Sequence, residues 1–148
     1  MRLPAHAIEH LLDTAPVARL VTLDPDGAPA PVPIVFVRLA GRIWSPIDGK
    51  PKSGRPLARV RNVRADPRVS LLVDAYTEDW ARLWWIRVRA EAHVVRGASA
   101  EGGTARDALR QKYPQYADVP LRGPRDEMLV LSPRSTQSWA ASPETWRA

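Results

Sequence analysis

The segment at residues 84–94 constrains the fold of this chain most, because its side chains alternate almost without interruption between apolar and polar. Successive side chains of a β-strand point to opposite faces of a sheet, so one face of this segment is expected to be buried and the other solvated. The apolar positions are Trp84, Ile86, Val88, Ala90, Ala92 and Val94, and the polar positions are Arg87, Arg89, Glu91 and His93. We therefore expect a long strand in a half-buried sheet.

Five further segments are predicted to be strands, and three to be helices. Apolar and β-branched runs bounded by turn residues indicate strands at residues 17–23, 32–39, 42–47, 69–73 and 128–131, the last ended by Pro133. Helices are expected after Pro4, after Pro56 and from Thr104, where Thr104 and Asp107 fit a capping box. Six mostly antiparallel strands with few helices favour a closed or nearly closed barrel, because closure removes exposed strand edges.

The composition fits one globular domain over residues 1–148. The chain has 45% hydrophobic and 26% charged residues and no Cys, so a disulfide framework and thiolate chemistry are excluded. The apolar N-terminal stretch is interrupted by Pro4, His6, Glu9, His10 and Asp13, so neither a signal-peptide core nor a membrane span is expected. We expect a cytoplasmic protein.

The net charge of +6 is concentrated in one window of the sequence. Residues 38–68 carry nine Lys or Arg and only two Asp. A local basic site indicates a phosphate or another anionic small molecule as ligand, whereas a uniformly basic surface would favour nucleic-acid binding in bulk. Nucleic acid is the weaker interpretation, because the aromatic residues are not interleaved with the Lys and Arg.

Lys50, Lys52, Arg55 and Arg59 form the sharpest candidate site in that window. They lie on a Gly- and Pro-containing loop after the third predicted strand and on the first turn of the next helix. Arg55 and Arg59 are four residues apart, so both can face one anion, and the helix N-terminus adds backbone N–H donors. The alternative is an ordinary solvated basic loop.

Aromatic residues cluster at the start of the clearest strand. Trp80, Trp84 and Trp85, with Tyr76 and Arg82, could line a pocket for a planar heterocycle, anchor a subunit interface or pack in the core. Because adjacent strand residues point to opposite faces, we expect one of Trp84 and Trp85 to be buried and the other to face outward.

The segment Val32-Pro33-Ile34-Val35 is a second candidate wall for a ring pocket. Pro33 cannot donate to a sheet ladder, so this segment could present backbone groups to the polar edge of a ring. An ordinary core strand is the simpler interpretation of the same residues.

The common catalytic motifs are missing from the sequence. There is no HExxH, GxGxxG, Walker or GxSxG pattern, and His6, His10 and His93 have no metal-ligand spacing. We therefore expect neither a hydrolase nor a metal site, and any redox chemistry would be carried by a cofactor.

Taken together, these segments resemble the pyridoxamine 5'-phosphate oxidase-like superfamily of flavin-binding split β-barrels. The similarity covers nearly the whole chain and depends on the order and spacing of its motifs. It includes residues 18–27, 32–36 and 44–48, the run Asp48-Gly49-Lys50-Pro51-Lys52 with Arg55, Leu57 and Arg59, and residues 61–71 and 83–94. Trp80, Arg82, Leu83-Trp84-Trp85 and Lys112-Tyr113-Pro114-Gln115-Tyr116 are similar to an actinobacterial branch that uses the deazaflavin coenzyme F420.

This resemblance implies a mainly β fold, a six-stranded antiparallel split β-barrel of the FMN-binding type, and a homodimer with the cofactor between protomers. Three groups of residues would hold the cofactor. They are Lys50, Lys52, Arg55 and Arg59 at the phosphate-bearing tail, Val32, Pro33, Ile34 and Val35 beside the ring, and Trp80 and Trp84, from this chain or its partner, closing the pocket.

The implied activity is that of an F420-dependent oxidoreductase, which transfers hydride between the reduced deazaflavin and a small electron-poor organic acceptor. No side chain of the protein is assigned a catalytic role. FMN is the alternative cofactor, for an oxidase or reductase of the same superfamily. A non-catalytic protein that binds flavin or haem is the alternative from another class, consistent with the absence of an acid–base pair.

Overall fold

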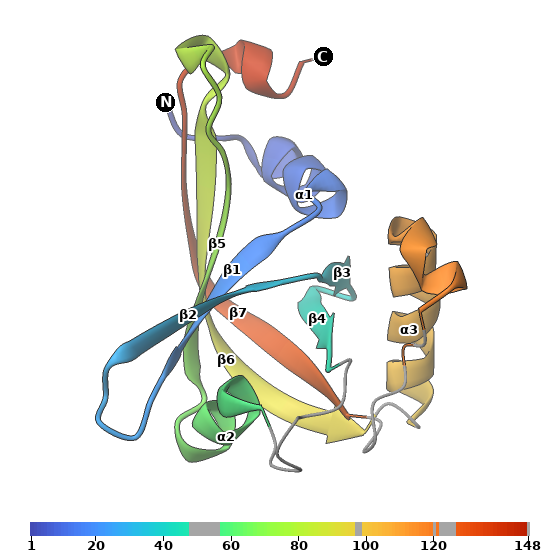
Figure 1. Ribbon diagram of the computed structural model, residues 1–148. Helices are drawn as coiled ribbons and strands as arrows, with labels where there is room; N and C mark the ends of the chain where they lie inside the picture. Colours follow the sequence, from blue (N-terminus) through green and yellow to red (C-terminus); the bar gives the residue numbers. More distant parts are fainter. Residues whose placement is uncertain (48–56, 97–98, 120, 122–126, 148) are drawn as a thin grey trace.

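The computed structural model describes residues 1–47, 57–96, 99–119, 121 and 127–147. In the described residues, three helices are interspersed among seven strands, with three short 3-10 turns (Figure 1). The elements are α1 (Ala5–Thr14), β1 (Ala18–Leu23), β2 (Pro29–Ile34), β3 (Val37–Leu39), β4 (Arg42–Pro46), α2 (Ala58–Ala65), β5 (Arg68–Ala75), η1 (Trp80–Arg82), β6 (Trp84–Arg96), α3 (Ala100–Lys112), η2 (Pro114–Ala117), β7 (Glu127–Ala140) and η3 (Pro143–Thr145).

The described strands form one antiparallel sheet of seven strands in the order β2-β1-β5-β6-β7-β4-β3. The sheet is strongly curved, and β2 and β3 at its two ends are not hydrogen-bonded to each other, which is the open form of a barrel (Figure 1). The prediction of a mainly β, split-barrel architecture is therefore confirmed in its coarse form. The predicted number of six strands is wrong.

The seventh strand arises because the segment expected as one strand at residues 32–39 is divided. β2 ends at Ile34 and pairs with β1, whereas β3 begins at Val37 and pairs with β4. Between them, the Val35 carbonyl accepts a hydrogen bond from Ser45 Oγ, and the Phe36 backbone bonds to the Tyr113 hydroxyl. Side chains rather than a sheet ladder satisfy the backbone here, so the chain can change partners at this point.

The last strand continues beyond the proline that was expected to end it. β7 runs to Ala140, and its pairing with β6 shifts where Ala90 lies opposite Pro133 and Arg89 lies opposite Ser135. One extra residue, Arg134, is therefore taken up by an irregularity in the ladder. A bulge tolerates a proline that a regular central ladder would not, which explains why the strand is not interrupted.

The third helix begins earlier than expected, whereas the first begins where it was expected. α3 begins at Ala100 and not at Thr104, because the Ser99 side chain caps it by accepting a hydrogen bond from the Gly102 backbone N–H at 3.1 Å. α1 begins directly after Pro4, with its cluster of Ala7, Leu11 and Leu12 buried against the sheet.

The core is split into two clusters by the sheet itself. One cluster lies on the concave side and contains the alternating inner residues of β1, β5 and β6 together with α1. The other lies between α3 and the β3-β4-β7 end, where Trp44, Val130 and Leu109 pack together. Adjacent residues of β4 and β7 contribute to opposite clusters, so this end of the sheet is covered on both faces.

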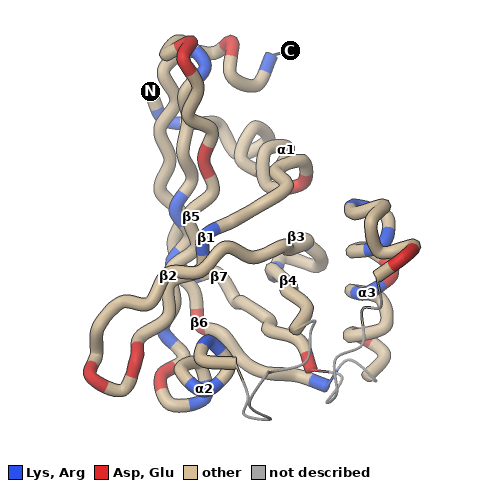
Figure 2. The backbone as a smooth tube through the Cα atoms, in the orientation of Figure 1, with Lys and Arg blue, Asp and Glu red and all other residues tan. Residues whose placement is uncertain are grey.

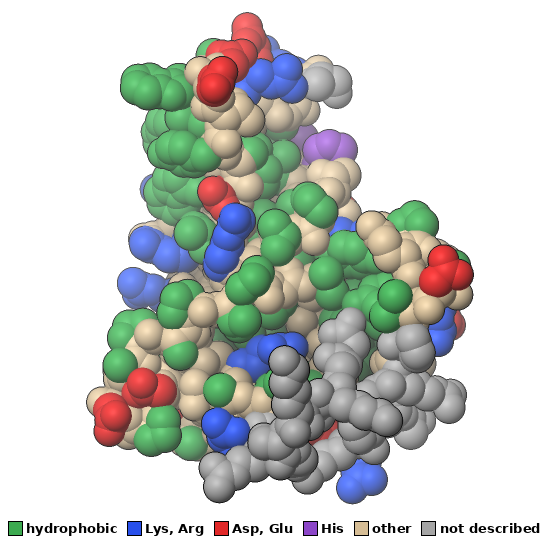
Figure 3. All heavy atoms as spheres, in the orientation of Figure 1, with side chains coloured by type: hydrophobic (Ala, Val, Ile, Leu, Met, Phe, Trp, Pro, Cys, Tyr) green, Lys and Arg blue, Asp and Glu red, His purple; other side chains and the backbone are tan. Residues whose placement is uncertain are grey.

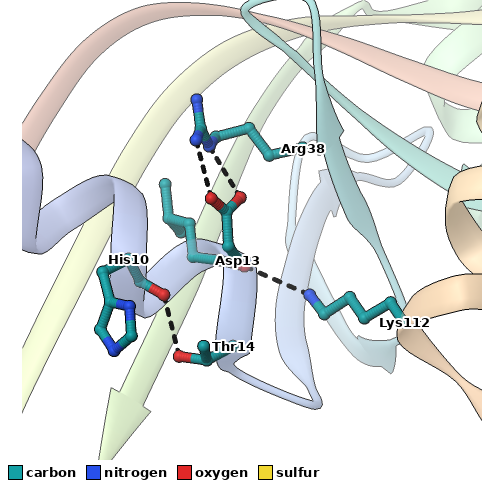
Figure 4. A network of polar contacts seen from close by, with 6 residues as sticks. His10, Asp13, Thr14, Arg38 and Lys112 are labelled. Carbon is teal, nitrogen blue, oxygen red and sulfur yellow. Dashed lines mark hydrogen bonds and ion pairs between the residues drawn. The ribbon is translucent and has the colours of Figure 1, made fainter.

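A polar network ties α1 to β3 and α3 (Figure 4). The Arg38 guanidinium donates to both oxygens of the Asp13 carboxylate at 2.9 and 2.8 Å, and Lys112 Nζ donates to the Leu12 carbonyl at 3.2 Å. Thr14 Oγ1 donates to the His10 carbonyl at 2.8 Å and completes the last turn of α1. The network fixes the distance between the two core-covering helices.

α2 is attached to the barrel by one buried hydrogen bond in addition to apolar packing of Val60 and Val63. The Asn62 side-chain amide donates to Thr22 Oγ1 of β1 at 3.0 Å, and both residues are buried. Burying two polar groups that bond to each other costs little free energy of folding. Removing one partner is destabilising, because the other is left buried without a hydrogen bond.

We expect Asn62→Ala to lower the free energy of unfolding by about 1–3 kcal/mol, because the Thr22 hydroxyl is left buried without its partner. Urea unfolding of Asn62→Ala, Thr22→Val and the double variant measures this coupling. The double variant should be more stable than the sum of the two single losses implies; strict additivity would show that the pair is not coupled.

Candidate functional site

A pocket of about 270 Å³ lies where the two halves of the divided strand meet β4 and α2. Its walls come from the residue preceding β1, from the end of β2 and the junction after it, from the end of β4 and from the start of α2. The lining residues are Val17, Pro33, Ile34, Val35, Ser45, Pro46 and Arg59. Three of the four residues predicted to flank a ring, and one of the four predicted basic residues, are thus brought to one place.

The β2 wall of the pocket is rich in prolines at alternate positions. Pro29, Pro31 and Pro33 lie opposite Leu23, Val21 and Arg19 of β1. Because proline has no backbone N–H, the hydrogen bonds from β2 to β1 must be made by the residues between the prolines. The bond from the Asp24 N–H to the Ala28 carbonyl at the turn belongs to the same alternating series of residues. The outer side of β2 therefore presents the carbonyl groups of these prolines, and the prolines contribute no N–H donor there.

The junction after β2 is held by two side chains that the sequence analysis did not single out as site residues. Ser45 Oγ donates to the Val35 carbonyl at 2.8 Å, and the Tyr113 hydroxyl contacts the Phe36 N–H at 3.1 Å and the Phe36 and Pro16 carbonyls at 3.0 Å each. Burial raises the pKa of Tyr113, against a lowering effect of the Phe36 backbone bond, so the hydroxyl stays protonated and able to donate.

Arg59 is the one ionisable side chain among the described residues that line the pocket. It is half-buried on the first turn of α2, a basic helix that also carries Arg61 and Arg64 (Figure 2). The pocket thus combines apolar side chains, backbone groups and one guanidinium. This donor set suits a ligand with an apolar ring and an anionic group, and it includes no side chain that exchanges a proton near neutral pH.

Three of the predicted phosphate-contacting residues, Lys50, Lys52 and Arg55, lie outside the described residues. Pro46 and Arg59, which are described and lie close to the two ends of residues 48–56, both line the pocket. Val32 does not line it, but packs partly against the main core.

The two predicted tryptophans lie elsewhere in this chain. Trp84 is 7% exposed and packs in the main core, because the even-numbered residues of β6 face inward. Trp80 is 76% exposed on η1, and neither residue contributes to the pocket of its own chain. Trp85 points to the other face, as expected from strand alternation, and the Arg87 guanidinium lies 5.6 Å from the centre of its ring.

Lys112 lies behind the pocket, on the α3 side of Phe36. Its Nζ is 3.8 Å from the centre of the Phe36 ring and donates to the Leu12 carbonyl. Burial lowers the pKa of Lys112 to about 8, with a smaller opposing effect of the Asp13 carboxylate. Folding thus destabilises the charged form of Lys112 relative to its neutral form.

An open antiparallel barrel with a shallow pocket at the junction of its divided strand is the architecture of a split-barrel protein. The chain belongs to the pyridoxamine 5'-phosphate oxidase family, whose model matches residues 4–140. No curated protein sequence matches the chain.

Solved structures share this fold at low sequence identity. A conserved hypothetical protein from Mycobacterium tuberculosis is 20% identical with a TM-score of 0.73, covering 94% of this chain and 86% of its own. The haem storage protein HutZ from Vibrio cholerae is 19% identical with a TM-score of 0.71 and 95% coverage of both chains. An FAD-binding protein from Mesorhizobium loti is 18% identical with a TM-score of 0.67, covering 93% and 95%.

The described residues contain neither a metal-binding group nor a membrane-spanning helix. No group of His, Cys, Asp or Glu there could hold a metal ion. None of the helices in those ranges has both the length and the apolar composition needed to cross a membrane.

The pKa of Lys112 predicts a pH dependence of stability. Its pKa is about 8 in the folded chain and 10.5 ordinarily, so between these values the unfolded chain binds more protons and the free energy of unfolding rises with pH. The contribution of one proton is at most about 1.4 kcal/mol per pH unit. Urea unfolding at pH 7, 8, 9 and 10 should show this rise in the native protein and a smaller rise in Lys112→Met; equal slopes would contradict the assignment.

Proposed function

We propose that this protein binds a flavin-type cofactor in the pocket at the β2–β3 junction and acts as an F420-dependent oxidoreductase. The observation that carries the proposal is the meeting of Pro33, Ile34, Val35 and Arg59 in one pocket of a chain from this family. When bound, the cofactor would supply the hydride chemistry that the protein's own side chains do not offer.

The residues of the pocket fit such a cofactor in three respects. The apolar side chains of Val17, Ile34 and Pro46 would contact the flat faces of a ring, and the backbone at Val35 would meet its polar edge. Arg59 would contact the anionic tail, together with Lys50, Lys52 and Arg55, which precede α2 in the sequence. The protein's part in catalysis is then to bind and orient the ring next to the acceptor.

F420 is preferred over FMN because of the similarity of the segments at residues 80–85 and 112–116 to the actinobacterial F420-using branch. An FMN-dependent oxidase or reductase is the alternative, and the FAD-binding protein with this fold is consistent with it. The expected acceptor is a small electron-poor organic molecule.

A non-catalytic haem-binding role is the second candidate, since the haem storage protein HutZ has the same fold. Haem iron is commonly held by an axial His. His6, His10 and His93 are all exposed, and none of them lines the pocket. The geometry of this chain therefore favours the flavin-type cofactor.

A homodimer is part of the proposal, and two observations support it. The pocket of about 270 Å³ is slightly smaller than the roughly 300–1,000 Å³ of typical ligand sites, as expected if a second protomer completes it. The outer sheet face exposes Leu72 at 37%, and the β5-β6 end exposes Tyr76 at 70% and Trp80 at 76%. Hydrophobic side chains gather at this projecting end of the molecule (Figure 3).

The same outer face carries complementary charges that would suit a contact between two copies of one surface. Arg19 pairs with Asp74, and Arg134 pairs with Glu91 beside a groove of about 360 Å³ that also contains Arg68 and Arg89. A self-complementary face with both signs of charge is expected in a two-fold interface. Trp80 of one protomer would then be able to reach the pocket of its partner.

The cofactor proposal is tested by titrating the protein with F420 and, separately, with FMN while following Trp fluorescence. Arg59→Ala should weaken binding about 10- to 100-fold, because a charge-assisted hydrogen bond contributes about 1.5–3 kcal/mol. The Lys52→Ala/Arg55→Ala double variant should also bind more weakly. Arg61→Ala, an exposed arginine of the same helix, is the matched control.

Tighter binding of FMN than of F420 would replace the leading cofactor by its alternative. Binding of neither would reject the proposed function.

The homodimer is tested by sedimentation velocity over a concentration series. Leu72→Asp should shift the protein from dimer towards monomer, because it buries a charge in the proposed interface. Val119→Asp, which changes another exposed apolar residue away from the sheet, is the control and should leave the mass unchanged. A native protein that sediments as a monomer would contradict the proposal.

A further inference from the structure

We propose that Tyr113 and Ser45 are positioning residues for the pocket, which together clamp one peptide group and thereby aim the Val35 N–H at the ligand. This inference rests on the proposed function, since the ligand it addresses is the polar edge of the cofactor ring. Neither residue was expected to belong to the site, and Tyr113 lies far from the pocket in the sequence.

The clamp acts on the peptide group between Val35 and Phe36. Its carbonyl oxygen accepts a hydrogen bond from Ser45 Oγ at 2.8 Å, and its N–H donates to the Tyr113 hydroxyl at 3.1 Å. Both ends of one peptide group are thus held by side chains, one from β4 and one from the residue that ends α3. Rotation of this peptide would break both bonds.

Tyr113 can hold the junction because it is itself held. It is 8% exposed and packs in the cluster beneath α3, and its ring meets Tyr116 edge-on at 6.1 Å between centres. Its hydroxyl lies 3.0 Å from the Pro16 carbonyl, next to the pocket residue Val17, and 3.0 Å from the Phe36 carbonyl. One hydroxyl therefore connects α3 with both chain segments that border the pocket.

The group that this clamp orients is the Val35 N–H. In extended backbone the N–H and C=O of one residue point to the same side of the strand. β2 bonds to β1 at Val32 and Ile34, so the next residue, Val35, directs its N–H and carbonyl groups away from β1. Its carbonyl accepts the bond from Ser45 of β4, and both residues line the pocket. Within the part of the chain that the structure describes, no hydrogen bond satisfies this N–H.

A backbone N–H donor at Val35 is important because this wall of the pocket has few other donors. The prolines of β2 remove the neighbouring outer N–H groups, so Val35 is the first residue after them able to donate there. A donor held by the surrounding structure needs no reorganisation when a ligand oxygen or nitrogen arrives. We therefore expect the clamp to contribute to affinity for a ring with a polar edge.

The experiment compares Tyr113→Phe and Ser45→Ala with the native chain, and uses Tyr116→Phe as the control that removes a tyrosine hydroxyl from the same region. Amide hydrogen exchange of the ligand-free protein is followed by NMR. The Phe36 amide should exchange at least about tenfold faster in Tyr113→Phe, because its acceptor is removed, and at the native rate in Tyr116→Phe. Unchanged exchange at Phe36 would overturn the clamp.

The second measurement adds F420 or FMN to the same proteins. Binding should shift the Val35 amide resonance of the native chain, and Tyr113→Phe and Ser45→Ala should each bind about three- to tenfold more weakly. Global stability measured in urea separates a positioning effect from general destabilisation. Native affinity in both variants would overturn the inference even if the cofactor binds, whereas a native chain that binds neither cofactor would reject the proposed function, and with it the role of Val35.

Discussion

The structure depends on the burial of one face of β6. This strand pairs with β5 on one side and with β7 over its full length on the other, and its inner residues Ile86, Val88 and Ala92 are 0–1% exposed. The strands bury one apolar face by curving around the apolar cluster that they share with α1. The sheet curves round in this way but does not close, because β2 and β3 at its two ends are not paired with each other.

The candidate site lies where the unpaired ends of the sheet meet β4 and α2. A strand that leaves one neighbour and joins another must satisfy its backbone in between, and here side chains from β4 and α3 do so at Val35 and Phe36. The same departure from the regular ladder creates the pocket beside Arg59. The Asn62–Thr22 bond holds α2, and therefore Arg59, at a fixed place relative to that junction. The pocket is thus a consequence of the split in the barrel.

Periodicity predicted most of the fold, because alternation reports directly which side of a strand is buried. Residues 84–94 are the clearest case, and the inward position of Trp84 follows from the same alternation. What alternation could not show was partner exchange at Val35, the bulge that accommodates Pro133, or the cap at Ser99, because each depends on contacts made by other elements. The sequence brought Pro33, Ile34, Val35 and Arg59 into one candidate site, and the structure places these four at one pocket, without Val32. Ser45 and Tyr113 could not be found in this way, because each bonds a backbone group of another part of the chain.

The prolines of β2 also have a consequence for how copies of this protein can meet. An edge strand normally offers alternate N–H and C=O groups, and another chain can extend the sheet by pairing with them. With Pro29, Pro31 and Pro33 on the outer side, this edge offers carbonyl acceptors. It lacks the backbone N–H donors at those three positions that pairing with another strand would require. Growth of the sheet into a continuous multi-chain ribbon is therefore disfavoured at this edge.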